Sequence, residues 1–306
     1  MRKKLLDILK WVWFVAVILG AGYYFYKNYQ KISVYLETIS ILRVTISVFL
    51  LFLGKFALSD LTRFSLKKIG EKLEYKDALT ITSITQLGKY LPGGIWHVAG
   101  KFGIYKARKI STKKATAAVV LENIWLLSSA LVIGATCLLI SSQDVLCEFN
   151  AVFCNAATNR AILIGLPILW LVALLLIDFY GFKENRYSVK DFLFLLLEVL
   201  VIWVSFGISF WLVFPLKSGF QMAITGAFSI SWVAGYVAFF APGGIGIREY
   251  LLTIILAAYF SNSELVTYAT IHRLIWVLVE VLLGAGSSLL FGIPMSAPAE
   301  SGEKDL

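Results

Sequence analysis

The sequence predicts an all-α polytopic membrane protein with an inverted-topology repeat, each half having three transmembrane helices and one re-entrant Pro-Gly-Gly hairpin. Two observations on composition point to the membrane: 59% of the 306 residues are hydrophobic, and the mean hydropathy is +0.79. Both values are typical of polytopic membrane proteins. A third observation predicts the repeat, because the motif Pro-Gly-Gly-Ile occurs at 92–95 and again at 242–245, each time inside an apolar run.

The apolar runs place the elements in order. With about 20 apolar residues per span, we expect helices near 11–27, 41–58, 115–141, 161–180, 192–214 and 265–291. The first of these follows a basic N-terminus and lacks a small-residue cleavage site, so it is expected to be a retained helix rather than a signal peptide. Two broken segments, near 78–108 and 222–260, are additional.

Each broken segment contains one Pro-Gly-Gly. Proline removes a backbone donor, and paired glycines tolerate positive φ. Irregular backbone at membrane depth is tolerated only where it is buried in protein or lines a watery cavity. We therefore expect both segments to be re-entrant hairpins whose tips meet inside the membrane.

Basic residues set the expected orientation, because they gather between the apolar runs in the positive-inside pattern. This pattern accounts for the net charge of +9 without a nucleic-acid partner. Three segments are expected to be cytoplasmic: the N-terminus (Arg2, Lys3, Lys4, Lys10), the loop after the second helix (Arg63, Lys67, Lys68, Lys72, Lys76), and the segment after the first hairpin (Lys101, Lys106, Arg108, Lys109, Lys113, Lys114).

The sides of the remaining loops follow from these three cytoplasmic segments. Segment 142–160 is expected outside and 181–191 inside, so the first hairpin enters from the cytoplasm and the second from outside. The expected location is the cytoplasmic (inner) membrane, with both termini and the polar tail 292–306 in the cytoplasm.

A single membrane domain is expected, with repeat halves of approximately 1–142 and 150–291. Shifting the first two helices by 150 positions places them on the fourth and fifth, and Gly134-Ala135 matches Gly284-Ala285. Three crossings per half invert the second half. In transporters, inverted repeats place broken helices face to face near the midplane, where the substrate site is built.

Residues around the two breaks form the candidate substrate site. Charges inside a bilayer cost at least about 2.5–3.5 kcal/mol each, so Lys89 and Arg248 should face the interior or water. Free amides at half-helix N-termini suit an anion such as phosphate. The candidate substrate-binding residues are Lys89, Tyr90, Pro92, Gly93, Gly94, Trp96, His97, Pro242, Gly243, Gly244, Arg248 and Glu249. In the alternative, Arg248 and Glu249 only pair and hold the hairpin together.

Polar residues inside the helices form a second candidate set. Shifting Glu122-Asn123 by 150 positions gives His272-Arg273, so the two pairs are expected at matching depths, as a gate or a clamp between the halves; Glu280 belongs to the same set. His97 and His272 are candidates for proton coupling because imidazole titrates near neutrality; the alternative is an ordinary hydrogen-bonding role.

The pattern of the three cysteines does not indicate a metal site. Cys147 and Cys154 share a polar segment without a histidine nearby, and they would pair only in an oxidising compartment. No Walker loop, nucleotide fingerprint or nucleophile elbow is found. We expect no cofactor, and energy from ATP would have to come from another subunit.

The stretches Lys89-Tyr-Leu-Pro-Gly-Gly-Ile-Trp96 and Pro242-Gly-Gly-Ile-Gly-Ile-Arg-Glu249 resemble the two signature motifs of the lysylphosphatidylglycerol synthase transmembrane (flippase-like) family. The resemblance covers nearly the whole chain. It implies an integral membrane protein that handles or translocates lipids, and it points to the same residues around the breaks. The soluble aminoacyl-transfer domain of the true synthases is not among these 306 residues, so synthesis of lysylphosphatidylglycerol is not expected of this chain alone.

The expected function is therefore translocation of an anionic phospholipid or a polyprenyl-linked glycolipid between leaflets, without catalysis. The expected partners are membrane lipids, an anionic or polyprenyl-phosphate lipid substrate, and envelope-biosynthesis proteins. One alternative is a membrane-embedded enzyme or assembly subunit in lipid-linked glycan or envelope lipid biosynthesis, which would need an acidic pair such as Glu122 and Glu249. Another alternative is a small-solute or ion transporter.

Overall fold

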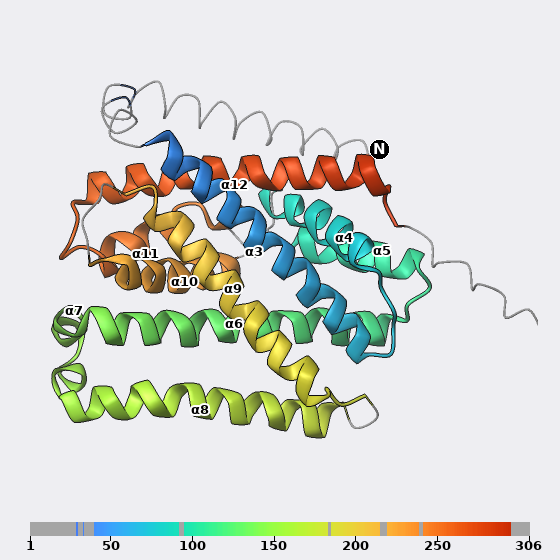
Figure 1. The fold of residues 1–306 in the computed structure, drawn as a ribbon, viewed down its shortest axis with the longest axis horizontal. Helices are drawn as coiled ribbons and strands as arrows, with labels where there is room; N and C mark the ends of the chain where they lie inside the picture. The colour runs from blue at the N-terminus through green and yellow to red at the C-terminus, as the bar shows by residue number, and fades with distance from the viewer. Residues whose placement is uncertain are drawn as a thin grey trace, which may run out of the picture.

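The computed structural model describes residues 29, 33, 40–91, 95–182, 185–214, 219–238 and 241–294. Every regular element within these residues is helical (Figure 1). The α-helices are α3 (Ile41–Lys68), α4 (Tyr75–Leu87), α5 (Trp96–Ala107), α6 (Thr112–Ser141), α7 (Gln143–Phe149), α8 (Ala156–Gly181), α9 (Val189–Trp211), α10 (Gln221–Val237), α11 (Ile247–Ile255) and α12 (Asn262–Phe291). Three short 3₁₀ helices are η1 (Gly88–Tyr90), η2 (Ala151–Cys154) and η3 (Pro242–Gly244). The predicted helix 11–27, the first Pro-Gly-Gly and tail residues 295–306 lie outside the described residues.

Five of these helices, α3, α6, α8, α9 and α12, are long and apolar enough to cross a membrane. They correspond to five of the predicted spans, and they confirm the prediction of an all-α, multi-pass membrane protein. The predicted broken segments also appear as pairs of shorter helices, α4 with α5 and α10 with α11.

Helix α3 is longer than the sequence indicates, since it continues ten residues beyond the predicted end at 58. Arg63, Lys67 and Lys68 therefore lie in a helix and not in a loop, which corrects the prediction. The extension is stabilised by apolar side chains that recur on its buried side, Leu61, Phe64 and Leu66. Its serines donate back to carbonyls one turn earlier, as Ser59 does to Lys55 and Ser65 to Leu61. Lysines in the last turn also suit the negative end of the helix dipole.

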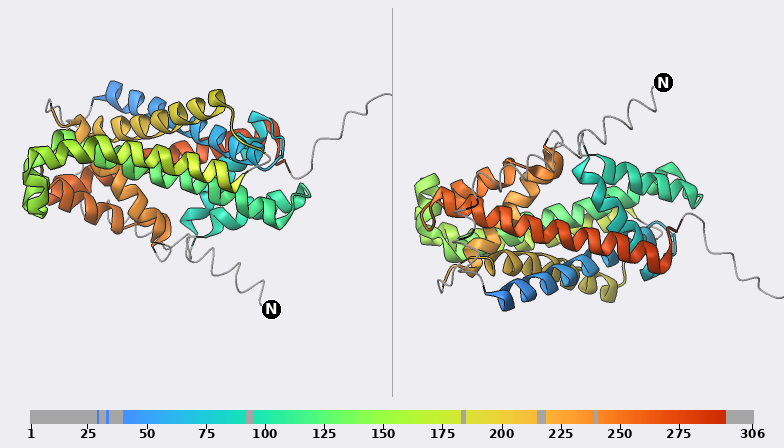
Figure 2. Two further views of the ribbon diagram at one scale, coloured as in Figure 1. Left: turned by 90° about the horizontal axis from the view of Figure 1, so that it is seen from below. Right: turned by 90° about the horizontal axis from the view of Figure 1, so that it is seen from above.

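The most extensive helix contacts form three pairs. Helix α3 packs on α9, α6 packs on α10, and α12 packs on α4. Figure 2 shows α4 and α5 gathered toward one end of the bundle and α10 and α11 toward the other. Two glycines allow close approach in these pairs. A Cβ on Gly134 would lie 3.1 Å from the carbonyl oxygen of Gly226 in α10, and one on Gly284 would lie 2.9 Å from Leu87 in α4.

Helix α8 lies along one edge of the bundle beside α6 (Figure 1). Only Asn159 and Leu174 are buried among its residues. Its other side chains are therefore largely free to contact lipid.

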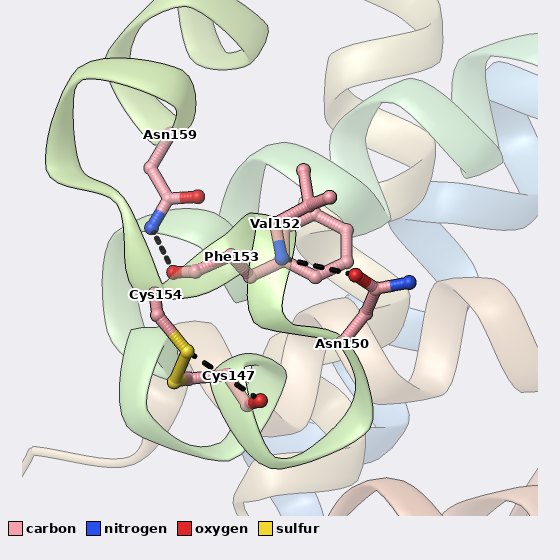
Figure 3. Close-up of a disulfide and its surroundings, with 6 residues drawn as sticks. All are labelled: Cys147, Asn150, Val152, Phe153, Cys154 and Asn159. Carbon is pink, nitrogen blue, oxygen red and sulfur yellow. Dashed lines mark hydrogen bonds between the residues drawn. A yellow bond between two sulfur atoms is a disulfide. The ribbon is translucent and has the colours of Figure 1, made fainter.

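The connection between α6 and α8 was expected to be a polar loop, but it contains α7 and η2. Cys147 in α7 and Cys154 in η2 form a disulfide (Figure 3), which settles the pairing that the sequence left open. Asn159 donates to the carbonyl of Phe153 at 2.7 Å, and Asn150 accepts from the amide of Val152 at 2.9 Å. The bond from Asn159 holds the connection against the start of α8, and the bond to Asn150 lies within the connection.

Candidate functional site

Helix η1, which precedes the first break, contacts η3 of the second break inside the helix bundle. A Cβ on Gly243 would lie 3.2 Å from the Tyr90 ring, so this glycine sits directly on the aromatic face. Gly243 and Gly244 have φ of 59° and 72°, the left-handed region that favours glycine. A Cβ on Gly244 would also lie 2.7 Å from the backbone of Gly235. Positive φ and close backbone approach together explain the paired glycines of the second motif.

A buried cluster of charges surrounds Glu280 of α12. Lys55 of α3 and Lys89 of η1 both donate to its Oε1 atom. The Trp276 indole donates to the same oxygen at 2.8 Å, and the Tyr90 hydroxyl donates to Oε2 at 2.6 Å. Glu280, Lys55 and Lys89 are only 2%, 5% and 8% exposed. Two lysines thus share one carboxylate, which leaves one buried positive charge without an acidic partner in the cluster.

Arg248 adds a second positive charge, which forms no ion pair with an acid of the described residues. It lies in the first turn of α11, and its guanidinium lies 5.3 Å from the centre of the Trp232 ring. Its Nε atom is buried and has no hydrogen-bond partner among the described residues.

The neighbouring acid, Glu249, is engaged elsewhere. It accepts from Arg273 at 2.5 Å and from the amide of Gly246 at 2.7 Å, capping α11. Arg273 also donates to the carbonyl of Gly243. The alternative in which Arg248 and Glu249 pair is therefore wrong: Glu249 neutralises Arg273 and fixes the second break to α12.

Lys89, Arg248 and Arg273 line one cavity of about 30 Å³, room for about two water molecules. The predicted site residues in its lining are Lys89, Tyr90, Gly243, Arg248, Glu249, His272 and Arg273. Among the described residues, the cluster around the cavity contains four cations (Lys55, Lys89, Arg248 and Arg273) and two carboxylates (Glu249 and Glu280). The surplus of two positive charges inside the helix bundle favours binding of an anion.

Other predicted site residues lie elsewhere. Trp96 begins α5 and is 38% exposed. His97 meets the Tyr236 hydroxyl at 3.1 Å. Pro242 begins η3, whereas Pro92, Gly93 and Gly94 lie outside the described residues. None of Trp96, His97 and Gly244 lines the cavity.

Glu122-Asn123 and His272-Arg273, which were predicted to form a gate or a clamp between the halves, do not contact each other in the described part of the chain. Glu122 pairs with Lys101 of α5 at 2.5 Å, and Asn123 accepts from Tyr236 of α10 at 2.5 Å. The imidazole Nε2 of His272 lies 3.0 Å from the Ser209 hydroxyl of α9. The physical reason is that α6 and α12 pack against different helices, α10 and α4, rather than against each other. Residues at equivalent positions on these two helices therefore meet different partners.

Contacts between the two predicted halves do exist, but they are made by other pairs of residues. Glu280 binds Lys55 and Lys89, and Asn123 binds Tyr236. The sequence reasoning missed Lys55, Trp276 and Tyr236. Lys55 carried a usable signal, a lone lysine within the apolar run 41–58, and Trp276 lies one helical turn before Glu280.

The acidic pair required by the enzyme alternative does not come together either. Glu249 lines the cavity, but Glu122 does not, and each carboxylate is held by a different cation. No family model and no curated protein matches the chain.

Proposed function

We propose that this protein translocates a lipid with an anionic headgroup between the leaflets of a membrane. The observation that carries the proposal is that Lys89 and Arg248, one beside each break, line the same cavity. A buried surplus of positive charge is costly unless an anion compensates it. A lipid phosphate would supply that charge, while the acyl or prenyl chains stay in the bilayer.

The proposed architecture is an inverted repeat, and the helix contacts support it. Exchanging the halves converts the α6–α10 contact into the α12–α4 contact, and it maps the α3–α9 contact onto itself. Gly134 and Gly284, which the 150-residue shift relates, each lie at one of these exchanged contacts.

The proposal also treats the two broken segments as re-entrant hairpins. Helix α4 has 13 residues and α10 has 17, lengths of about 20 and 26 Å at 1.5 Å per residue. Both are shorter than the hydrocarbon core of about 30 Å. In the proposal each segment turns back at its break, and the contact between the two helices of each pair supports this.

We propose an orientation in which the disulfide-bonded connection faces an oxidising compartment, because disulfides persist in such compartments. The opposite end of α6, with Lys106, Lys113 and Lys114 nearby, then lies in the cytoplasm according to the positive-inside rule. This arrangement fits the cytoplasmic membrane.

A liposome assay tests the function. The purified chain is reconstituted in vesicles with a fluorescent phosphatidylglycerol, and the inner-leaflet label is measured over time by its protection from an external quencher. We expect Lys89→Ala and Arg248→Ala each to slow translocation about tenfold or more, because each removes a charge-assisted contact of about 1.5–3 kcal/mol. Lys106→Ala, an exposed lysine outside the cavity, should be neutral. Unchanged rates in both cavity variants would contradict the proposal.

A further inference from the structure

A second cavity lies where α3 and α8 end and α6 begins. Its volume is about 570 Å³, within the range of 300–1,000 Å³ that is usual for small-molecule sites. Its lining includes Lys68, Ser111, Lys113, Lys114, Tyr180 and Asn185. No acidic residue is part of the lining in the described part of the chain.

The three lysines differ in their surroundings. Lys68 is 2% exposed, and its ammonium donates to Asp178 and lies 3.9 Å from the centre of the Tyr187 ring. Lys114 is exposed and donates to Glu71 at 2.6 Å. Lys113 is exposed and forms no ion pair with a described residue. The cavity therefore has a fixed cation in its wall and an unpaired cation at its rim.

The surroundings of this cavity are those of a membrane interface. Helix α8, which forms one wall, exposes Leu176, Phe179 and Tyr180 by 49%, 47% and 66%. Lysines and tyrosines at the ends of spanning helices lie at headgroup level, where their polar tips reach water. The ligand would thus have an anionic group beside the lysines and an apolar part along α8.

We propose that this cavity binds the headgroup of an anionic phospholipid, with its acyl chains along the exposed side of α8. Basic pockets between transmembrane helices bind such headgroups in other membrane proteins. The site does not depend on the translocation proposed above, because it shares no lining residue with the first cavity.

The test counts the lipids that the full-length protein retains. Protein is taken from phosphatidylcholine vesicles with and without phosphatidylglycerol, and native mass spectrometry measures bound phosphatidylglycerol. The charge variant is Lys113→Ala with Lys114→Ala. Its matched control, Lys106→Ala with Lys190→Ala, removes two exposed lysines that are outside the cavity. A steric variant, Ala117→Trp, fills the cavity without changing its charge.

We expect the charge variant to bind phosphatidylglycerol roughly 30-fold more weakly, at a factor of about five for each lysine near the lipid surface. The steric variant should lose the bound lipid, while the control and Lys89→Ala should retain it. Equal losses in the charge variant and its control would overturn the proposal. Displacement of the lipid by millimolar inorganic phosphate would also overturn it, since the site would then be one for a soluble anion. If the protein retains phosphatidylglycerol but does not translocate it, only the function proposed above is contradicted.

Discussion

Lys89 and Glu280, 191 positions apart in the chain, form a buried ion pair that joins the first break to α12. Lys55 donates to the same carboxylate oxygen, so Glu280 is the counter-ion of two lysines at once. This carboxylate holds Lys89, one of the two cations that we propose for the phosphate. An incoming anion must therefore share or replace Glu280, which links binding to a rearrangement at the centre of the bundle.

The first prediction concerns this counter-ion. Glu280→Gln should destabilise the folded protein by about 3–5 kcal/mol, because removing one partner of a buried ion pair leaves uncompensated charge. Combining it with Lys55→Met should recover much of that loss, since one of the two lysines is removed as well. Thermal unfolding in detergent measures both variants. Equal stability of Glu280→Gln and the wild type would show that the pair contributes nothing.

The second prediction concerns the second break. Gly244→Ala should lower the unfolding temperature strongly and reduce the folded yield, because its φ is 72° and a Cβ would lie 2.7 Å from the Gly235 backbone. The matched control is Gly103→Ala in α5, where a Cβ would meet nothing within 4 Å. Alanine is favoured over glycine inside a helix by about 1 kcal/mol, so the control should be neutral or slightly stabilising. Similar effects of both substitutions would refute the proposed role of Gly244.

The third prediction concerns orientation. In intact cells, a membrane-impermeant maleimide should label Cys147 and Cys154 only after reduction by an impermeant phosphine. A reporter introduced by Lys106→Cys in a chain without other cysteines should be labelled only after the membrane is opened. Labelling of the Lys106→Cys reporter in intact cells would contradict the proposed orientation and indicate the opposite one.

The fourth prediction concerns the network around α6. Tyr236→Phe removes the hydroxyl that donates to Asn123 at 2.5 Å and meets His97 at 3.1 Å. It should lower stability by about 1–3 kcal/mol, the cost of an unsatisfied buried group, and leave binding of anionic lipid unchanged because Tyr236 does not line the cavity. Stability is followed by thermal unfolding and binding by lipid retention. A loss of lipid binding without a loss of stability would contradict this prediction and show that Tyr236 contributes to the binding site.

The sequence was sufficient for much of the fold, because spans such as 115–141 and 161–180 are predominantly apolar runs whose length is that of a membrane crossing. The breaks were also predictable, since Pro-Gly-Gly is incompatible with a continuing helix. The end of α3 was not, because Ser59, Thr62 and Ser65 read as a polar segment although the bundle buries them.

The site was predicted only in part. Lys89 and Arg248 were identified because charge is costly in an apolar segment. Their partners were not: that Lys55 shares Glu280 depends on how α3, η1 and α12 converge, and spacing along the chain does not encode this convergence. The 150-residue shift relates Glu122-Asn123 to His272-Arg273. The two pairs nevertheless do not meet, because α6 packs on α10 whereas α12 packs on α4.

The most direct test of the central claim is a double-mutant cycle on Lys89 and Arg248 in an Ala117→Trp background, which fills the second cavity, with binding of phosphatidylglycerol to the purified protein as the readout. If both cations hold one phosphate, Lys89→Ala and Arg248→Ala should be non-additive, with a coupling of about 0.5–3 kcal/mol. Strictly additive losses, or full binding by the double variant, would contradict a shared anion site between the two breaks.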